Sequence, residues 1–321
     1  MRCAKARVAL AQAILRRVSR RILITGASSG IGAAAAAEFA HEGADLALVA
    51  RSREGLEAVA ARARADGVRA HVVVADLGSR EAAERAVAES VAALGGLDIL
   101  VWNAASMVFG RFSEVPAEDF DRTMAVTFGG AVDTVRAALP HLERSRGAIV
   151  ATGSVNARIP LSSFASYASA KHALRGFLGS LRIEMRDRAT GVSVSMVHPG
   201  PVDTPLWHNV SSGTGREPRN PPDTYSPQTI ARALVAVAIR PRAEVTIGGE
   251  ARLIELAFAA SRPLADLVLL LVGRYYATGR EPVPGRGGLW EPQGAGRADG
   301  GLHGRPSVWG AVRLGRRLLP W

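Results

Sequence analysis

The chain has 321 residues, 48% of them hydrophobic, and a formal net charge of +11. Its length and apolar content predict a globular protein with a sizeable core. Its single cysteine, Cys3, excludes an internal disulfide, which favours the reducing cytoplasm as its location.

The positive charge is concentrated at the two ends of the chain. Residues 1–21 carry +7 and residues 274–321 carry +5, which leaves −1 for residues 22–273. Because no aromatic-basic platform or recognition helix accompanies this charge, we expect no nucleic-acid partner. Residues 1–19 have the pattern of a basic amphipathic helix without a secretory cleavage site, so peripheral contact with an anionic membrane and a solvated leader both stay open.

From residue 22 onward, short apolar runs alternate with alanine-rich stretches of helical composition. The apolar runs lie at residues 22–25, 46–50, 71–75, 98–102, 148–152, 192–197 and 244–248. Continuous apolar strands joined by crossover helices are typical of a parallel sheet that is covered on both faces. The sequence therefore predicts an α/β fold, a doubly wound domain of about seven parallel strands with helices on both faces.

The first strand runs into TGASSGIG at residues 25–32, and a helix follows. Its three glycines allow a tight turn and a close approach to a pyrophosphate, whose charge the helix N-terminus attracts. A glycine-rich loop between a strand and a helix therefore predicts dinucleotide binding. The cofactor-binding residues assigned to this loop are Gly26, Ser28, Ser29, Gly30, Ile31 and Gly32.

The second and third strands end at residues that bear on cofactor choice. An NAD-selective site usually has an acid after the second strand, whereas this chain has Arg51, which suits the 2′-phosphate of NADP. NADP is the favoured cofactor, NAD is possible, and a solvated surface arginine is the alternative. Asp76, followed by Leu77, suits a hydrogen bond from the adenine amino group, with a helix N-cap as the other interpretation.

The last third of the chain is less regular. Residues 205–227 predict a mobile loop or lid, in which Trp207 could cap a hydrophobic substrate or anchor packing. Residues 264–273 are apolar but too short to span a membrane, so we expect a core, dimer-interface or membrane-surface helix. Beyond residue 273, 16 of 48 residues are Gly or Pro, which predicts a poorly ordered tail.

Five motifs follow one another along the chain: TGASSGIG, ADL, the serine of ATGSV, YASAK and HPGPVDT. As a set, over about residues 20–248, they resemble the short-chain dehydrogenase/reductase family. The resemblance implies a Rossmann-type domain that holds NAD(P) at the carboxyl ends of its strands and transfers hydride between the nicotinamide and a carbonyl or alcohol. We expect a leader at 1–19, the NAD(P)-binding domain at 20–250, a C-terminal extension at 251–321, and a homodimer or homotetramer.

The same resemblance assigns the catalytic residues. Tyr167 matches the general acid/base, and Lys171, on the same helix face, matches the lysine that holds the nicotinamide ribose and lowers the pKa of the tyrosine. Ser154 matches the hydroxyl that hydrogen-bonds the substrate oxygen. Further residues matched to the cofactor site are Asn103, Ala104, Pro199, Gly200, Val202 and Thr204.

The chain departs from the family pattern at its fourth catalytic position. Thr127 stands where the family has a helical asparagine that supports a water; a threonine hydroxyl could hold that water, and Gly129-Gly130 could let the helix distort. A second departure, Trp102 with Ala105, changes the packing around Asn103. VTFGG, YSPQTIARALVAVAIRPRAEVTIGG and LWEPQGAGRADGGLHGR are similar to a bacterial, C-terminally extended group in which this threonine is ordinary.

The leading hypothesis is an NADP-dependent carbonyl reductase or alcohol dehydrogenase with a small-molecule substrate. A dinucleotide-binding regulatory or scaffold protein with negligible turnover is the alternative. We expect no metal site, because the spacing of the histidines is wrong for shared ligation. The histidines considered are His172, His198 and His208.

Overall fold

The structure, a computed structural model, describes residues 20–302 except 222–223, 278, 280–281, 283–286 and 293–295. The expected leader at 1–19 lies outside the described residues. One parallel sheet has the strand order β3-β2-β1-β4-β6-β7-β9. Its strands are β1 (Arg21–Thr25), β2 (Asp45–Ala50), β3 (Ala70–Val74), β4 (Ile99–Trp102), β6 (Ala148–Thr152), β7 (Ser193–Pro199) and β9 (Glu244–Ile247). The seven predicted strands and the doubly wound fold are confirmed.

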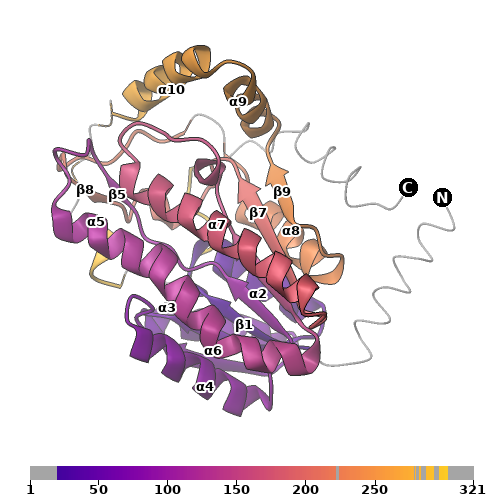
Figure 1. Cartoon of the computed structure of the whole chain (residues 1–321). Helices are drawn as coiled ribbons and strands as arrows, with labels where there is room; N and C mark the ends of the chain where they lie inside the picture. Colours follow the sequence, from indigo (N-terminus) through magenta and orange to yellow (C-terminus); the bar gives the residue numbers. More distant parts are fainter. Residues whose placement is uncertain are drawn as a thin grey trace, which may run out of the picture.

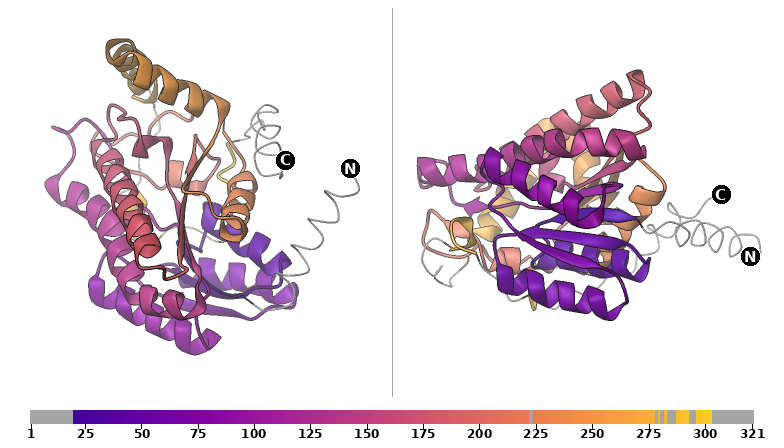
Figure 2. Two further views of the ribbon diagram at one scale, coloured as in Figure 1. Left: turned by 45° about the vertical axis from the view of Figure 1, so that its right-hand side comes forward. Right: turned by 90° about the horizontal axis from the view of Figure 1, so that it is seen from below.

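Helices cover both faces of the sheet (Figures 1 and 2). One face packs against α2 (Gly30–His41), α3 (Arg53–Ala65) and α8 (Pro227–Ile239). The other packs against α4 (Arg80–Leu94), α6 (Gly130–Ser145) and α7 (Ala165–Asp187). Successive strand residues point to opposite faces, so Ile22 and Ile24 belong to the first core and Leu23 to the second. This two-sided burial explains why the strands are apolar throughout.

The strand order reverses between β1 and β4, which are neighbours in the centre of the sheet. From there the crossovers run in opposite directions, so the loops after these two strands diverge and leave a crevice at the carboxyl edge. The loop after β1 carries the glycine-rich stretch, and the loop after β4 begins at Asn103. The topology thus brings both predicted segments to one place.

The segment with Thr127 is locally distorted, as the sequence predicts. A π-helical turn, η1 (Ala125–Gly129), joins α5 (Ala117–Met124) to α6. A Cβ at Gly130 would lie 2.1 Å from the carbonyl oxygen of Leu77, so only glycine permits this approach.

The remaining elements surround the carboxyl edge of the sheet. Two-residue strands β5 (Val108–Phe109) and β8 (Ser211–Ser212) pair with each other, and short 3-10 turns are η2 (Val155–Ala157), η3 (Pro205–Trp207) and η4 (Gly287–Leu289). Helices α9 (Gly249–Ala260) and α10 (Arg262–Tyr276) follow β9, and α10 confirms the helix expected at 264–273. In the part of the chain that is described, no helix combines the length and apolar character needed to cross a membrane.

Candidate active site

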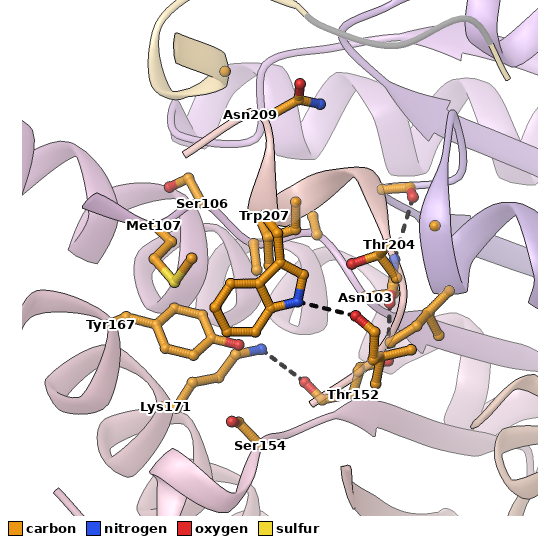
Figure 3. Close-up of a pocket in the computed structure, with 18 of the residues that line it drawn as sticks. Asn103, Ser106, Met107, Thr152, Ser154, Tyr167, Lys171, Thr204, Trp207 and Asn209 are labelled. Atoms are coloured by element: carbon orange, nitrogen blue, oxygen red, sulfur yellow. Dashed lines mark hydrogen bonds between the residues drawn. The ribbon is translucent and has the colours of Figure 1, made fainter. Parts of the chain in front are cut away.

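A cavity of about 500 Å³ opens at the carboxyl edge of the sheet. Its lining includes every residue assigned above to the cofactor or to catalysis except Gly32 and Thr127. The structure therefore brings together residues that are spread over 178 positions of the chain, from Gly26 to Thr204. Figure 3 shows the end of the cavity that contains Tyr167.

Three of the four predicted catalytic side chains meet at this end. Tyr167 and Lys171 lie one turn apart on α7, and the Lys171 ammonium is 5.6 Å from the centroid of the Tyr167 ring. Lys171 is 1% exposed and donates a hydrogen bond of 2.8 Å to the carbonyl oxygen of Thr152 (Figure 3). Ser154 lies two residues after β6 at the same end of the cavity, and it acts to lower the pKa of the Tyr167 phenol. We call this group, Ser154 with Tyr167 and Lys171, the catalytic end of the cavity.

Burial controls the ionisation of both α7 residues. The Tyr167 ring is partly buried, and this burial raises the pKa of its phenol to about 12, although Ser154 acts in the opposite direction. Burial likewise lowers the pKa of Lys171 to about 7. Sequence analysis expects Lys171 to lower the pKa of Tyr167. In the protein without cofactor this pKa is raised instead, because desolvation is the largest influence on it.

Lysine at position 171 is unusual in this sequence. The chain has 40 Lys and Arg residues, of which only Lys5 and Lys171 are lysines. An arginine could not take this place in the same way, because a guanidinium is planar and stays charged, whereas an amine fits a narrow buried site and can lose its proton. The amine is thus used where its titration and compact shape matter.

A hydrogen-bond network fixes the strands under the catalytic end. The Asn103 amide donates to the carbonyl oxygen of Gly26 at 3.2 Å and accepts from the Thr152 hydroxyl at 3.0 Å. Asn103 therefore links the loop after β1 to the end of β6. Buried His198 contacts the carbonyl oxygen of Ser154 through Nδ1 at 3.0 Å, so β7 holds the backbone of the catalytic serine in place.

Thr127 has a different position from the other predicted catalytic residues. It is fully buried and lies outside the cavity lining. Its hydroxyl donates to the carbonyl oxygen of Ser106 at 3.1 Å and accepts from the Ser106 amide at 3.0 Å. Thr127 therefore secures the loop that brings Ser106 and Met107 to the cavity, and the predicted water-holding role finds no direct support in these contacts.

The glycine-rich loop has the geometry that its residues predict. Gly26 and Gly30 have φ angles of +63° and +57°, in the left-handed region that favours glycine. A Cβ at Gly32 would lie 2.1 Å from the carbonyl oxygen of Gly26, so the turn closes only with glycine there. Gly30 begins α2, and its amide points out of the helix N-terminus.

Arg51 and Asp76 mark the other end of the cavity, which we call the adenosine end. Arg51 is partly buried and donates to the carbonyl oxygens of Gly288 and, at 3.0 Å, Leu289, so it is not a solvated surface arginine. Burial lowers the pKa of Arg51, and the charge of Asp76 opposes this shift. Asp76 pairs with Arg122, while the N-cap of α4 is Ser79, so the N-cap interpretation of Asp76 is wrong.

Sequence reasoning missed one whole wall of the catalytic end. Three residues of α10, Leu269, Val272 and Tyr276, line the cavity. The Tyr276 ring stacks on Trp207 with centroids 5.6 Å apart and an interplanar angle of 9°. The apolar run at 264–273 signalled a buried helix face, but nothing in the sequence indicated its partner.

Residues 287–302 also differ from expectation. The sequence predicts a poorly ordered tail beyond residue 273, yet the described pieces 287–292 and 296–302 make specific hydrogen bonds with the cavity rim. Within the described residues, no group of three or more His, Cys, Asp or Glu side chains is placed to hold a metal ion.

Comparison with known proteins identifies relatives over most of the chain. The family model described as short chain dehydrogenase matches residues 20–215. The chain is 34% identical over 251 residues to the uncharacterized oxidoreductase YxnA of Bacillus subtilis. The matched region covers 77% of this chain and 70% of that protein. It is 38% identical over 185 residues to the hydroxysteroid 11-beta-dehydrogenase 1-like protein of Xenopus tropicalis, covering 57% of this chain and 65% of that protein.

Solved structures match the same fold. A short chain dehydrogenase of Burkholderia cenocepacia in complex with NADP is 33% identical, with a TM-score of 0.64 over 73% of this chain and 98% of that chain. An alcohol dehydrogenase of the archaeon Thermococcus sibiricus, complexed with 5-hydroxy-NADP, is 29% identical. Its TM-score is 0.63, and the match covers 71% of this chain and 95% of that chain. Both structures are matched almost whole, while more than a quarter of this chain has no counterpart in either.

Proposed function

Because this chain belongs to the short-chain dehydrogenase family of oxidoreductases, we propose that it transfers hydride between NADP(H) and an apolar carbonyl or alcohol compound. The observation that carries this proposal is the convergence of Ser154, Tyr167 and Lys171 at one end of a cavity whose other end is the glycine-rich loop. The glycine-rich loop and Tyr167 line one continuous cavity, as an extended dinucleotide with its reactive ring beside Tyr167 requires.

The residues present fit a dinucleotide. Gly30 at the start of α2 would bind the pyrophosphate, Asp76 the adenine, and Lys171 with Asn103 the nicotinamide ribose. Arg51 would bind a 2′-phosphate, which favours NADP over NAD, and two related structures hold NADP or a derivative of it. When bound, this cofactor would donate or accept the hydride.

The catalytic end supplies the proton. In reduction, Ser154 and Tyr167 would donate hydrogen bonds to the carbonyl oxygen, where negative charge develops, and Tyr167 would pass its proton to that oxygen. The raised pKa of Tyr167, about 12, keeps the phenol protonated across the neutral range, which suits this role. Oxidation needs the phenolate, so we expect its rate to rise with pH while reduction does not.

The lining of the catalytic end favours an apolar substrate. Its walls are aromatic and aliphatic, and among the described residues the charged ones that line the cavity are Arg51, Asp76 and Lys171. None of these is free to bind a substrate carboxylate if the first two meet the adenosine and the third the ribose. A bulky alicyclic or aromatic ketone therefore fits better than a sugar or a hydroxy acid. The apolar wall consists of Met107, Ile159, Leu161, Phe164, Trp207, Leu269, Val272 and Tyr276.

The test is a reductase screen with NADPH and NADH in parallel, using alicyclic and aromatic ketones alongside sugars and hydroxy acids. We expect NADPH oxidation with apolar ketones, and a loss of at least about 100-fold in Tyr167→Phe, which should still bind NADPH. Equal rates in the two proteins would remove Tyr167 from the mechanism.

A non-catalytic dinucleotide-binding regulator is the second candidate. It is favoured by the position of Thr127, which is tied to Ser106 and lies outside the cavity lining. NADPH binding without turnover across the ketone panel would support it. Recovery of turnover in Thr127→Asn would indicate instead an enzyme weakened at that position.

We propose the cytoplasm as the location, with peripheral membrane contact through the outer face of α10. That face exposes four apolar side chains, and Arg262 and Arg274 flank it. Co-sedimentation with anionic vesicles tests the contact, and no difference between the wild type and a variant with the four residues changed to serine would refute it. The four residues are Leu267, Val268, Leu270 and Leu271. We also propose a homodimer or homotetramer, which light scattering would distinguish from a monomer.

A further inference from the structure

Two described pieces of the C-terminal chain, residues 287–292 and 296–302, lie across the adenosine end of the cavity. We call them together the C-terminal strap. Gly288, Leu289 and Pro292 of the strap line the same cavity as the glycine-rich loop. The strap therefore forms part of the wall that a dinucleotide would contact.

The strap accepts hydrogen bonds from the donors assigned above to the cofactor phosphates. Arg51 donates to the carbonyl oxygens of Gly288 and Leu289, the latter at 3.0 Å. The Gly30 amide, at the start of α2, donates to the carbonyl oxygen of Arg297 at 2.9 Å. Backbone carbonyl oxygens thus occupy positions where 2′-phosphate and pyrophosphate oxygens would also find their donors.

We propose that the C-terminal strap is a built-in competitor for the phosphates of the dinucleotide and thereby a determinant of the choice between NADP and NAD. This inference rests on the proposed function, because it takes Arg51 and Gly30 as phosphate donors. It concerns a part of the chain that lies outside residues 20–215, the range that the family model matches.

Contacts away from the phosphate donors anchor the strap. Nε1 of Trp290 donates to the Asp119 carboxylate at 2.7 Å, and the Arg122 guanidinium lies 5.3 Å from the Trp290 ring centroid. On α3, Arg62 donates to the carbonyl oxygen of Gly296. The Asp203 carboxylate accepts from the amides of Gly300 and Leu302, each at 2.9 Å. These anchors hold the strap close to Arg51 and Gly30 and raise its effective concentration there.

Charge determines how strong this competitor is. Arg51 and Arg122 lie near one carboxylate, that of Asp76, which is already paired with Arg122. To Arg51 the strap presents only neutral carbonyl oxygens, which do not balance its charge. A phosphate is the better acceptor, so the strap weakens dinucleotide binding without preventing it. Because Arg51 faces the 2′-phosphate, NADPH should be affected more than NADH.

The test weakens an anchor and leaves the phosphate donors intact, in the full chain. Arg62→Ala removes the bond to Gly296, and Trp290→Phe keeps a ring beside Arg122 but removes the bond to Asp119. Arg85→Ala, on α4, is the matched control, because it also removes one exposed arginine. Thermal melting confirms that each variant is folded, and the Kd of NADPH and of NADH is measured by calorimetry without substrate.

We expect the Kd of NADPH to fall about three- to tenfold in both strap variants, the Kd of NADH to fall less, and the control to stay within about twofold of the wild type. The sign is decisive, because loss of an arginine by itself would weaken the binding of a polyanion. A Kd that is unchanged or higher in both variants would overturn the competitor role.

Measuring binding separately from turnover keeps the two proposals distinguishable. If the wild type binds NADPH and reduces ketones while the strap variants bind no better, the strap proposal alone fails. If only the strap variants bind NADPH, the competitor role is supported in its strongest form. If no variant binds either dinucleotide, the proposed function fails and the strap proposal with it.

Discussion

The reacting groups at the catalytic end, Ser154, Tyr167 and Lys171, lie close together after β6 and on α7, whereas the adenosine end has partly exposed charged groups. Lys171 is 1% exposed and is bonded to Thr152, 19 positions earlier. Arg51 is bonded to Leu289, 238 positions later. The first arrangement needs only the folded sheet and one helix, while the second also needs the C-terminal chain to return to the sheet.

The two ends should therefore respond differently to substitution: the catalytic end mainly in turnover, and the adenosine end mainly in cofactor affinity. Burial controls the ionisation of the buried Lys171 amine and the partly buried Tyr167 phenol, so changes there should alter turnover and its pH dependence strongly. At the adenosine end Arg51 would exchange the strap carbonyl oxygens for a cofactor phosphate at the partly exposed rim of the cavity. Changes there should therefore shift the affinity for the dinucleotide by modest factors. The following experiments test whether the two ends are as separate as their geometry indicates.

Lys171→Met should have the largest effect. The variant removes the buried amine and its bond to Thr152, and we expect turnover to fall about 100-fold or more. It should also change how stability depends on pH. In the wild type the folded amine loses its proton near pH 7, while the unfolded chain keeps it to 10.5. The unfolded state therefore binds the extra proton between these values, and stability should rise with pH by up to about 1.4 kcal/mol per unit.

Urea unfolding at several pH values measures this slope, which should be reduced in Lys171→Met. The two-lysine composition allows a direct measurement as well. Protein labelled with ¹³C-lysine should give two signals, and the one that is missing in Lys171→Met should titrate near pH 7. Two signals that both titrate near pH 10.5 would show that burial does not control Lys171.

Thr127→Val should have the next largest effect and belongs to neither end. The variant keeps the shape of the side chain but removes two hydrogen bonds, which leaves the amide and carbonyl of Ser106 without them in a buried place. We expect a loss of about 1–3 kcal/mol in the free energy of unfolding. Turnover should fall through the displaced Ser106 loop, while the Kd of NADPH should change little.

Thr134→Val is the matched control for this variant. Thr134 lies on α6, is 1% exposed, and its hydroxyl has no hydrogen-bond partner among the described residues. Its replacement should be neutral or slightly stabilising. If both threonine variants lost the same stability, the bonds to Ser106 would not be what distinguishes Thr127.

The sequence predicts the strands and the reacting groups Tyr167 and Lys171 well because their determinants are local. Strand positions follow from continuous apolar runs, and Tyr167 with Lys171 follows from helical spacing. Even the distortion beside Thr127 follows from Gly129-Gly130. These features need few contacts between distant parts of the chain.

The rest depends on contacts that composition does not reveal. Tyr276 stacks on Trp207 across 69 positions, and either aromatic ring by itself has many plausible partners. The C-terminal strap is less visible still, because it accepts hydrogen bonds through backbone carbonyls, which every residue has. Its high glycine content predicts disorder from side chains alone, although the same residues let its backbone approach Arg51 and Thr204 closely.

Arg51→Gln should have the smallest effect and is the most informative about the adenosine end. The variant removes a charge that would meet the 2′-phosphate, so NADPH should bind more weakly, by up to about tenfold. It also removes the hydrogen bonds to the carbonyl oxygens of Gly288 and Leu289. Because the strap then competes less well with the cofactor, part of the lost NADPH affinity should be recovered. NADH has no 2′-phosphate and should bind equally well or slightly better. Calorimetry with both dinucleotides measures the pair of constants, and equal weakening of the two would mean that Arg51 does not distinguish them.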